Sequence, residues 1–529
     1  MAGVGFELKK LFRSKDGYLR NLHGFAVSTA VTQGPMLLNI LMLLLLRFLM
    51  RQTGARMMDQ EWFLYTVTYA TMFSLIFSNT LLMFIDRFVS DCIYKGEEDR
   101  ILPSFFTLLF ALLSVFGPVA LGYIIMIPRD PLYKVAALLQ FGELLVIWSE
   151  MSYLSAIKQY GKVLLGFLAS VIVAALVGFA LLRFTSLDRV CAALLAICTG
   201  YAVMLLMYFQ QMLMYYPHAN FSLFDCIPAL DEHRILIAIG FFMALGIYAH
   251  NFVFWFSEMR NTIWSGGVFC TRYDIPAFFA TFTITPMLVM FVVAVETQVY
   301  EYYRAYFDAI LYGGTLQDIQ LARHNLLHVI FRECSHMMEL QLFVTVVSAT
   351  FLGNFLSGLG LDAEQTAIFR ILCFGYCLFG MMKCLIILML YFEDRGGALV
   401  GTVLFAALST LLSLVTLGMD PALWGFGFTA AAFISVLYAA FRIRHFLEHL
   451  ESKVFLRQPL FAQEASGFFT RLALRMTRLD ERARRHFYRR HGKKIEKRRK
   501  AYEQFRNAPE APCEGGPGAD APRPPAERM

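Results

Sequence analysis

Long apolar segments, separated by short polar connections, make up most of this 529-residue chain. A helix of about 20 apolar residues crosses the hydrocarbon core of a bilayer, so each apolar run of about 18 or more predicts one membrane span. The pattern predicts twelve spans, and this even number places both ends of the chain on one side of the membrane. The predicted spans are roughly 24–46, 62–85, 101–127, 132–157, 162–182, 189–215, 234–256, 276–299, 338–360, 366–391, 397–418 and 421–441.

The residues ahead of the first span predict its orientation, because basic flanks of a span stay on the cytoplasmic side. Five basic residues oppose two acidic ones there: Lys9, Lys10, Arg13, Lys15 and Arg20 against Glu7 and Asp16. Without the C-terminal tail, the loops on that side hold 15 Lys and Arg, and those on the opposite side hold 10. The apolar run is too long for a signal peptide and lacks a small-residue cleavage pattern. We therefore expect a multi-pass protein with both termini cytoplasmic.

Two long polar connections divide the predicted bundle. Residues 216–233 separate spans one to six (1–215) from spans seven to twelve (234–450), as in a transporter built from two six-helix lobes. Residues 300–336 form a second cytoplasmic connection, in which Thr315 followed by Asp318 is typical of a helix start. Apolar residues at helical spacing then predict a face that rests on the membrane surface or docks a partner. With Thr315, these residues are Leu316, Ile319, Leu326, Leu327 and Ile330.

The C-terminal tail is predicted to have two parts. Residues 451–506 are basic, with fourteen Lys and Arg between 471 and 500 against Asp480, Glu481 and Glu496. Such a segment binds anionic lipid head groups or an acidic partner, at about 1 kcal/mol per charge near the surface. Residues 507–529 are rich in Pro, Gly, Ala and Glu and have nothing to bury, so we expect disorder there.

Composition supports a membrane protein and argues against an enzyme. The chain is 58% apolar and 16% charged, whereas a soluble domain carries roughly 25% charged residues. The net charge of +7 is concentrated in the tail, since 21 of the 47 Lys and Arg lie from Arg442 onward. The sequence has no phosphate-binding GxxxxGK[ST] motif, no DxD motif and no large soluble domain, so we expect no catalytic residue, no cofactor and no nucleic-acid partner.

Metal chemistry is not expected either. The ten cysteines include no CxxC pair. His324 and His328 are spaced i, i+4, as are His445 and His449, but a metal site needs further ligands. We interpret these histidines as ordinary surface residues.

Several segments resemble the PelG family of exopolysaccharide transporters of the bacterial inner membrane, a distant branch of the MOP flippase superfamily. The resemblance covers about the first 450 residues. It is carried by MAGVGFELKKLF at the start, Gly34-Pro35, RFVSD at 87–91, FVFWFSE at 252–258, YDIPAFFA at 273–280 and VETQVYEYYRAYFDAILYGGTLQDI at 295–319. One departure stands before FWFS, where His250-Asn251 replaces the Asp-Lys pair expected in relatives. A role in ion coupling or charge pairing assigned to that pair is therefore in doubt in this chain.

The resemblance implies two six-helix lobes around a path that opens alternately to each side. It also implies assembly with a cytosolic glycosyltransferase and small membrane partners, including a cyclic-di-GMP-responsive one, that make an N-acetylhexosamine-rich biofilm polymer.

In that architecture helices one, two, seven and eight line the path. Their neutral polar side chains suit transient hydrogen bonds to sugar hydroxyl and acetamido groups, although such residues also bridge helices in ordinary packing. The predicted path residues are Gln33, Asn39, Asn79, His250, Asn251, Thr281, Thr283 and Thr285. Gly34, Pro35 and Pro286 are predicted hinges, because proline breaks backbone hydrogen bonds within a helix.

Four charged residues fall within or beside predicted spans. Glu143 and Glu150 lie seven residues apart on one helix face, with Lys158 toward the cytoplasmic end, and Lys383 lies in span ten. A charge at the middle of a membrane costs about 2.5–3.5 kcal/mol, so such residues face protein or water. Two interpretations stay open: a charge pair or proton site that couples transport, or structural pairing with Lys158 reaching the interface.

The sequence thus predicts an exporter of a polysaccharide or of its lipid-linked precursor. Two alternatives remain. One is a small-molecule antiporter on the same fold. The other is a non-transporting scaffold that docks a glycosyltransferase through residues 300–336 and the tail.

Overall fold

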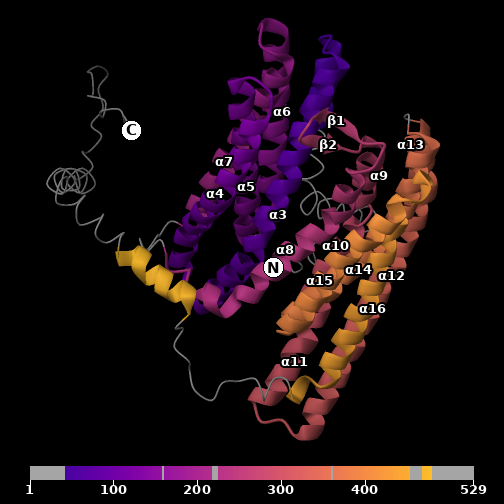
Figure 1. Ribbon diagram of the computed structural model, residues 1–529. Helices are drawn as coiled ribbons and strands as arrows, with labels where there is room; N and C mark the ends of the chain where they lie inside the picture. Colours follow the sequence, from indigo (N-terminus) through magenta and orange to yellow (C-terminus); the bar gives the residue numbers. More distant parts are fainter. Residues whose placement is uncertain (1–41, 158–159, 217–223, 359–360, 453–466, 479–529) are drawn as a thin grey trace, which may run out of the picture. The chain divides into compact units, whose positions relative to one another are not determined.

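The computed structural model describes residues 42–157, 160–216, 224–358, 361–452 and 467–478 (Figure 1). Within them are eleven helices long and apolar enough to cross a membrane. The protein is therefore a polytopic all-α membrane protein, as the apolar pattern predicts. The first predicted span, 24–46, lies almost entirely outside the described residues, and the chain is helical over 42–52. The division into two six-helix lobes stays a prediction.

The first half of the described chain contains five long helices. They are α3 (Met57–Lys95), α4 (Ile101–Met126), α5 (Pro131–Ile157), α6 (Tyr160–Phe184) and α7 (Arg189–Tyr215), with the short η1 (Glu98–Arg100) before α4. α3 ends at Gly96, whose φ of 73° is the left-handed conformation that closes many helices. α7 packs against both α5 and α6, and α5 packs against α3 and α4.

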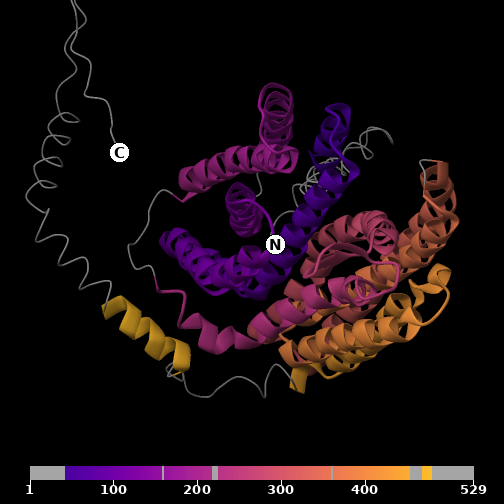
Figure 2. The ribbon, with the colours of Figure 1, turned by 45° about the horizontal axis from the view of Figure 1, so that its top comes forward.

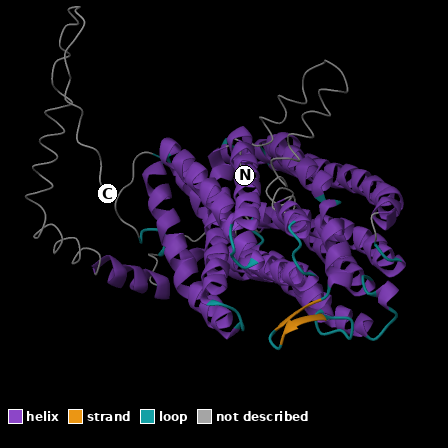
Figure 3. Cartoon of the chain, turned by 90° about the horizontal axis from the view of Figure 1, so that it is seen from above, coloured by secondary structure: helices purple, strands orange, loops and turns teal. Residues whose placement is uncertain are grey.

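The second half begins with α8 and contains the strands that the described residues form. Its elements are α8 (Ala229–Phe254), β1 (Asn261–Trp264), β2 (Gly267–Phe269), α9 (Thr271–Phe282), α10 (Thr285–Ala294), η2 (Val295–Val299), α11 (Tyr300–Leu311), α12 (Leu316–Val347), η3 (Ser348–Leu352), α13 (Gly353–Gly358), α14 (Ala363–Tyr391), α15 (Arg395–Leu417), η4 (Pro421–Leu423) and α16 (Phe426–Glu448). β1 and β2 pair as one antiparallel hairpin, drawn in orange in Figure 3.

Helix α8 joins the halves, because it packs against α3 on one side and α15 on the other (Figure 2). Glycines make both contacts close. A Cβ on Gly240 would lie 2.1 Å from the carbonyl oxygen of Asn79, and one on Gly246 would lie 2.6 Å from the ring of Phe405. Small residues at such crossings let helix backbones approach within van der Waals contact, which stabilises packing inside a membrane.

Observed helices agree with the predicted spans at most ends and extend beyond them where the sequence becomes polar. Residues 300–336 are largely helical, as predicted, but they continue the eighth and ninth spans and do not form a helix of their own; their cytoplasmic location stays a prediction. α11 continues the eighth span, α12 leads directly into the ninth, and only residues 312–315 connect them. The predicted helix start at Thr315 is confirmed, because Thr315 and Asp318 form a reciprocal capping box.

The tail is described only over residues 467–478. There the backbone N–H groups of Phe469 and Thr470 donate to the Asp231 carboxylate at 3.1 and 2.7 Å. Residues from Leu472 onward belong to a second compact unit. Most of the predicted basic segment, and all of 507–529, lie outside the described residues.

Candidate functional site

A cavity of about 220 Å³ lies between α3, α4 and α5. Aromatic and aliphatic side chains form most of its wall, and its hydroxyl groups come from Tyr65, Thr66, Tyr69, Tyr123 and Tyr133. Along α3 the lining residues Tyr65, Tyr69, Phe73 and Phe77 recur every four positions, which places them on one helix face. The cavity therefore offers mainly ring faces, because these hydroxyl groups are hydrogen-bonded to one another or to the backbone of the β-hairpin.

The β-hairpin of the second half contacts these tyrosines. The hydroxyl of Tyr69 donates to the carbonyl of Val268 at 2.6 Å, and Nε1 of Trp264 donates to the hydroxyl of Tyr65 at 3.1 Å. The hydroxyl of Tyr123 donates to the carbonyl of the hairpin turn at 3.1 Å. The hairpin thus holds tyrosines of α3 and α4 from the other half of the protein.

Trp255, just after α8, continues this aromatic surface. Its ring stacks on Tyr69, with centroids 4.7 Å apart and planes 12° from parallel. Its Nε1 donates to Oδ2 of Asp274 at 2.9 Å, and Nδ2 of Asn251 donates to Oδ1 at 2.8 Å. The N–H of Cys270 donates to the same Oδ2 at 3.1 Å. Asp274 lies in the first turn of α9, where the helix dipole favours a carboxylate.

His250 is fully buried next to this group. Its Nδ1 is hydrogen-bonded to the hydroxyl of Tyr273 at 2.8 Å, and its ring lies 4.3 Å from that of Phe428. The predicted path residues His250 and Asn251 therefore lie together, bonded to neighbouring residues of α9. Among the residues described, the acidic partner at this position is Asp274, supplied from another helix.

The remaining predicted path residues lie elsewhere. Asn79 donates to the carbonyl of Leu75 in its own helix, and Thr281 and Thr283 donate to carbonyls of α9. Thr285 is buried at the start of α10. Gln33, Asn39, Gly34 and Pro35 lie outside the described residues. The residues that line the aromatic cavity do not include any predicted path residue, so a common path for that set stays a prediction.

The eighth span is interrupted at the predicted hinge Pro286. α9 ends at Phe282, and Pro286 stands in the first turn of α10, where its missing N–H is not needed. The fully buried Gln341 of α12 donates its Nε2 to the carbonyl of Thr283 at 2.7 Å. This hydrogen bond satisfies a carbonyl group at the helix break and connects the interrupted eighth span to the ninth span.

The intramembrane glutamates lie on α5 facing α7. Glu150 is 2% exposed, Glu143 lies beside Cys198, and one carboxylate oxygen of each has no hydrogen-bond partner among the described residues. Lys383 of α14 forms no ion pair in the described chain, and Lys158 lies outside it. Whether the glutamates couple transport or serve packing stays open.

A set of charges joins the two halves where α3 ends. Arg87 of α3 forms an ion pair with Glu393 at 2.8 Å, and Arg395 holds the other oxygen of Glu393 at 2.7 Å. Asp91 of α3 lies 3.7 Å from Nε2 of His233 in α8. Glu393 has φ 63°, which is strained for a residue with a side chain and is sustained here by its two arginine partners. We call Arg87, Glu393 and Arg395 the ion-pair lock.

The predicted docking residues divide between two environments. Leu326 and Ile330 are each 1% exposed and pack within the protein, Ile319 and Leu327 are half-buried, and Leu316 is 67% exposed. With Leu311, Tyr312 and Leu321, Leu316 forms an exposed apolar tip of the α11–α12 hairpin. In the part of the chain that is described, no three His, Cys, Asp or Glu residues gather as a metal site would require.

Among known protein families, the model of the PelG exopolysaccharide exporter (EPS-E) family matches residues 1–455. The chain belongs to the PelG family. Curated protein sequences gave no match. The family match ends before residue 467, so the helix that Asp231 caps lies beyond what the PelG family defines.

Solved structures show the fold of this PelG-family chain. An outward-facing multidrug-resistance MATE transporter of the MOP superfamily is similar with a TM-score of 0.54 and 12% identity, over 80% of this chain and 96% of that one. The eukaryotic MATE transporter AtDTX14 is similar with a TM-score of 0.54 and 9% identity, over 85% and 99%. The protein is thus a membrane transporter of the MOP type in fold.

Two features of the site were missed by sequence reasoning. Asp274 lies within the YDIPAFFA segment that carries the resemblance, and this was the signal that could have identified it. The tyrosine row of α3 has the spacing of any helix face, so it could not be preferred over other aromatic stripes from the sequence alone.

Proposed function

We propose that this chain exports a polysaccharide rich in N-acetylhexosamines across the bacterial inner membrane, with both termini in the cytoplasm. The aromatic cavity carries the proposal. The apolar C–H face of a pyranose ring stacks on an aromatic ring, while its hydroxyl groups find donors and acceptors at the ring edge. A wall of tyrosines supplies the ring faces, and its hydroxyl groups would exchange their present partners for those of the sugar.

Weak contacts suit a polymer that must move. Each hydrogen bond to a sugar replaces one to water and nets about 0.5–1.5 kcal/mol, so a few tyrosines hold a sugar without trapping it. The cavity is large enough for about one sugar ring, since ligand pockets for whole drug-sized molecules run to about 300–1,000 Å³. We therefore expect it to contact one residue of the polymer at a time.

Movement requires the halves to separate and close again. The β-hairpin and Trp255 hold the halves together beside the cavity, and the ion-pair lock holds them where α3 ends. Opening toward either side would break one set of contacts and keep the other. The side toward which the path opens is then determined by which of the two sets of contacts is formed.

The proposed partners follow from exposed surfaces. The apolar tip of the α11–α12 hairpin would dock the cytosolic glycosyltransferase, with small membrane partners, one of them cyclic-di-GMP-responsive, completing the complex. The basic tail would bind anionic lipids. The exposed tip also favours the alternative in which the chain only anchors the synthase.

Export by the protein reconstituted with its synthase tests the proposal. Tyr69→Leu removes the ring that stacks on Trp255 and should lower polymer entry into vesicles about tenfold, because a stacking contact and a hydrogen bond together contribute about 1–3 kcal/mol. Tyr69→Phe should cost less, and Tyr438→Phe on α16, remote from the cavity wall, should cost nothing. Loss of synthase binding with export per complex unchanged would instead support the scaffold, and export of small cations without polymer would support the antiporter.

A further inference from the structure

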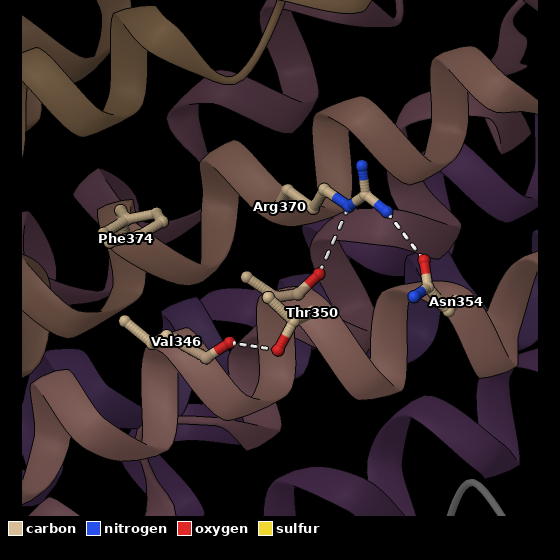
Figure 4. A pocket seen from close by; sticks show the side chains of 6 residues that line it. Val346, Thr350, Asn354, Arg370 and Phe374 are labelled. Atoms are coloured by element: carbon tan, nitrogen blue, oxygen red, sulfur yellow. Dashed lines mark hydrogen bonds between the residues drawn. The ribbon is translucent and has the colours of Figure 1, made fainter.

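A second cavity, of about 340 Å³, lies between the ninth and tenth spans and opens to the surface (Figure 4). α12, η3 and α13 form one wall, and α14 forms the other. Six residues line it: Val346, Ala349, Thr350, Asn354, Arg370 and Phe374. It is separate from the aromatic cavity and shares none of its residues.

Arg370 is the charged residue of this cavity. Its Nε donates to the carbonyl of Ala349 at 3.2 Å, and its Nη2 donates to Oδ1 of Asn354 at 2.8 Å. Ala349 belongs to the π-helical turn η3, whose wider winding displaces carbonyls from their usual partners. Among the described residues no carboxylate pairs with Arg370, and its Nη1 has no hydrogen-bond partner. The guanidinium is thus positioned by neutral groups and keeps its charge unbalanced.

The depth of Arg370 places its charge near the lipid head groups. α14 has 29 residues, or about 43 Å at 1.5 Å per residue, against a hydrocarbon core of about 30 Å. Arg370 lies about 10 Å from the start of the helix, and therefore close to the edge of that core. Its surroundings are exposed and apolar, with Phe351 74% and Phe355 63% exposed. A cation on a lipid-facing surface at this depth lies at the level of the lipid head groups, where anionic phosphates are within its reach.

We propose that this cavity binds the phosphate head group of an anionic phospholipid, with Arg370 as the main ligand. Arginine presents paired N–H donors that match phosphate oxygens. Nη1 reaches the phosphate, the hydroxyl of Thr350 lies at the cavity wall, and Val346 and Phe374 contact the first part of an acyl chain. The lipid would fill the groove between α13 and α14, a place where the packing of the ninth span against the tenth is interrupted by η3. The site does not depend on the nature of the exported polymer.

Lipid retention by the purified full-length protein tests this site. We expect phosphatidylglycerol to be retained in native mass spectra and to raise the thermal midpoint more than phosphatidylcholine does. Arg370→Gln should weaken phosphatidylglycerol binding about tenfold, the equivalent of one charge-assisted contact, and abolish the difference between the two lipids. The matched control is Arg272→Gln, since Arg272 is exposed too but forms an ion pair with Glu364.

Two further variants separate lipid binding from a structural role of Arg370. Arg370→Lys keeps the charge and should keep part of the preference. Thr350→Trp fills the cavity, leaves Arg370 in place and should remove the preference even if Arg370→Gln fails to fold. Equal preference for phosphatidylglycerol in the native protein and Thr350→Trp would overturn the proposal. So would an equal midpoint rise with inorganic phosphate alone, which would make the ligand a free anion.

Discussion

At the scale of single residues, the site depends on one carboxylate that joins three segments. Asp274 accepts hydrogen bonds from Asn251, from Trp255 and from the backbone of Cys270. The sequence could point to residues 250 and 251, because polar side chains in an apolar helix are conspicuous. It could not show that the partner is Asp274, because a contact across 23 residues depends on how α8 turns back through the hairpin into α9.

Removing the Asp274 carboxylate should therefore release Trp255 from its position on Tyr69. Asp274→Ala leaves three buried donors without a partner, at about 1–3 kcal/mol each, and should lower the thermal midpoint and reduce export about tenfold. Asp274→Asn keeps an acceptor and should lie between Asp274→Ala and the native protein. Tryptophan fluorescence would report the change at Trp255.

The control for this prediction is Trp255→Phe, which keeps a ring on Tyr69 but lacks the N–H donor. It should be milder than Asp274→Ala if Asp274 acts by holding the ring. A Trp255→Phe protein that loses as much export as Asp274→Ala would show instead that the indole N–H itself is needed.

At the scale of helices, apolar length predicted the spans well, and the sites where helices touch were not predictable. The Arg87–Asp91 segment is one of those that resemble the PelG family, yet its partner Glu393 lies some 300 positions later, in a turn with no distinctive pattern. The helix break at Pro286 could be predicted from the sequence, because proline interrupts a helix through local geometry alone. The hydrogen bond from Gln341 to the carbonyl of Thr283 could not be predicted, because it depends on the register of α12 against α10.

The ion-pair lock should bias the protein toward the state described here. The side chains of Arg87 and Glu393 are 42% and 44% exposed, so this pair contributes only about 0.2–1 kcal/mol. Glu393→Gln or Arg87→Gln should therefore change the population of the state in which the lock is formed by about 1.4- to fivefold, and less at high salt. Accessibility of a cysteine placed beside the lock would measure the shift.

Reversing the pair provides the control for the lock. Arg87→Glu with Glu393→Arg should restore part of the population in which the lock is formed, although Arg395 would then face a like charge. Identical accessibility in the native protein and both single variants would show that the contact forms without affecting the equilibrium.

At the scale of the whole molecule, the class of fold could be derived from hydropathy alone, because a membrane admits only helices with internally satisfied backbones or closed barrels. Twelve predicted spans and the eleven in the described residues differ by the first span, which lies almost wholly outside them. The aromatic cavity could not be derived in this way. Its wall comes from three helices, and hydropathy does not distinguish a ring that lines a cavity from one that fills a core.

The topology of the chain determines whether the α11–α12 turn lies on the cytoplasmic side, where the synthase would bind. The hairpin region and the α11–α12 turn lie at opposite ends of the span Thr271–Leu311, so they must lie on opposite sides of the membrane. Tyr312→Cys, 84% exposed in that turn, should react with an impermeant maleimide only after the cells are opened, and Glu258→Cys should react in intact cells. In the same turn, Gly314 is unsuited to a cysteine, because a Cβ there would lie 2.6 Å from the carbonyl oxygen of Ala309.

Native thiols should leave this labelling experiment readable once Cys513, which lies outside the described residues, is replaced by Ser. All nine cysteines in the described chain are buried, and burial raises the pKa of the Cys226 thiol, in the connection before α8, to about 12. At pH 8 that group is almost entirely protonated and unreactive, since the thiolate is the nucleophile and its fraction grows only as pH approaches the pKa. Labelling of Tyr312→Cys in intact cells, with Glu258→Cys protected, would invert the topology. The α11–α12 tip would then face away from any cytosolic synthase, and the proposed docking surface would have to be abandoned.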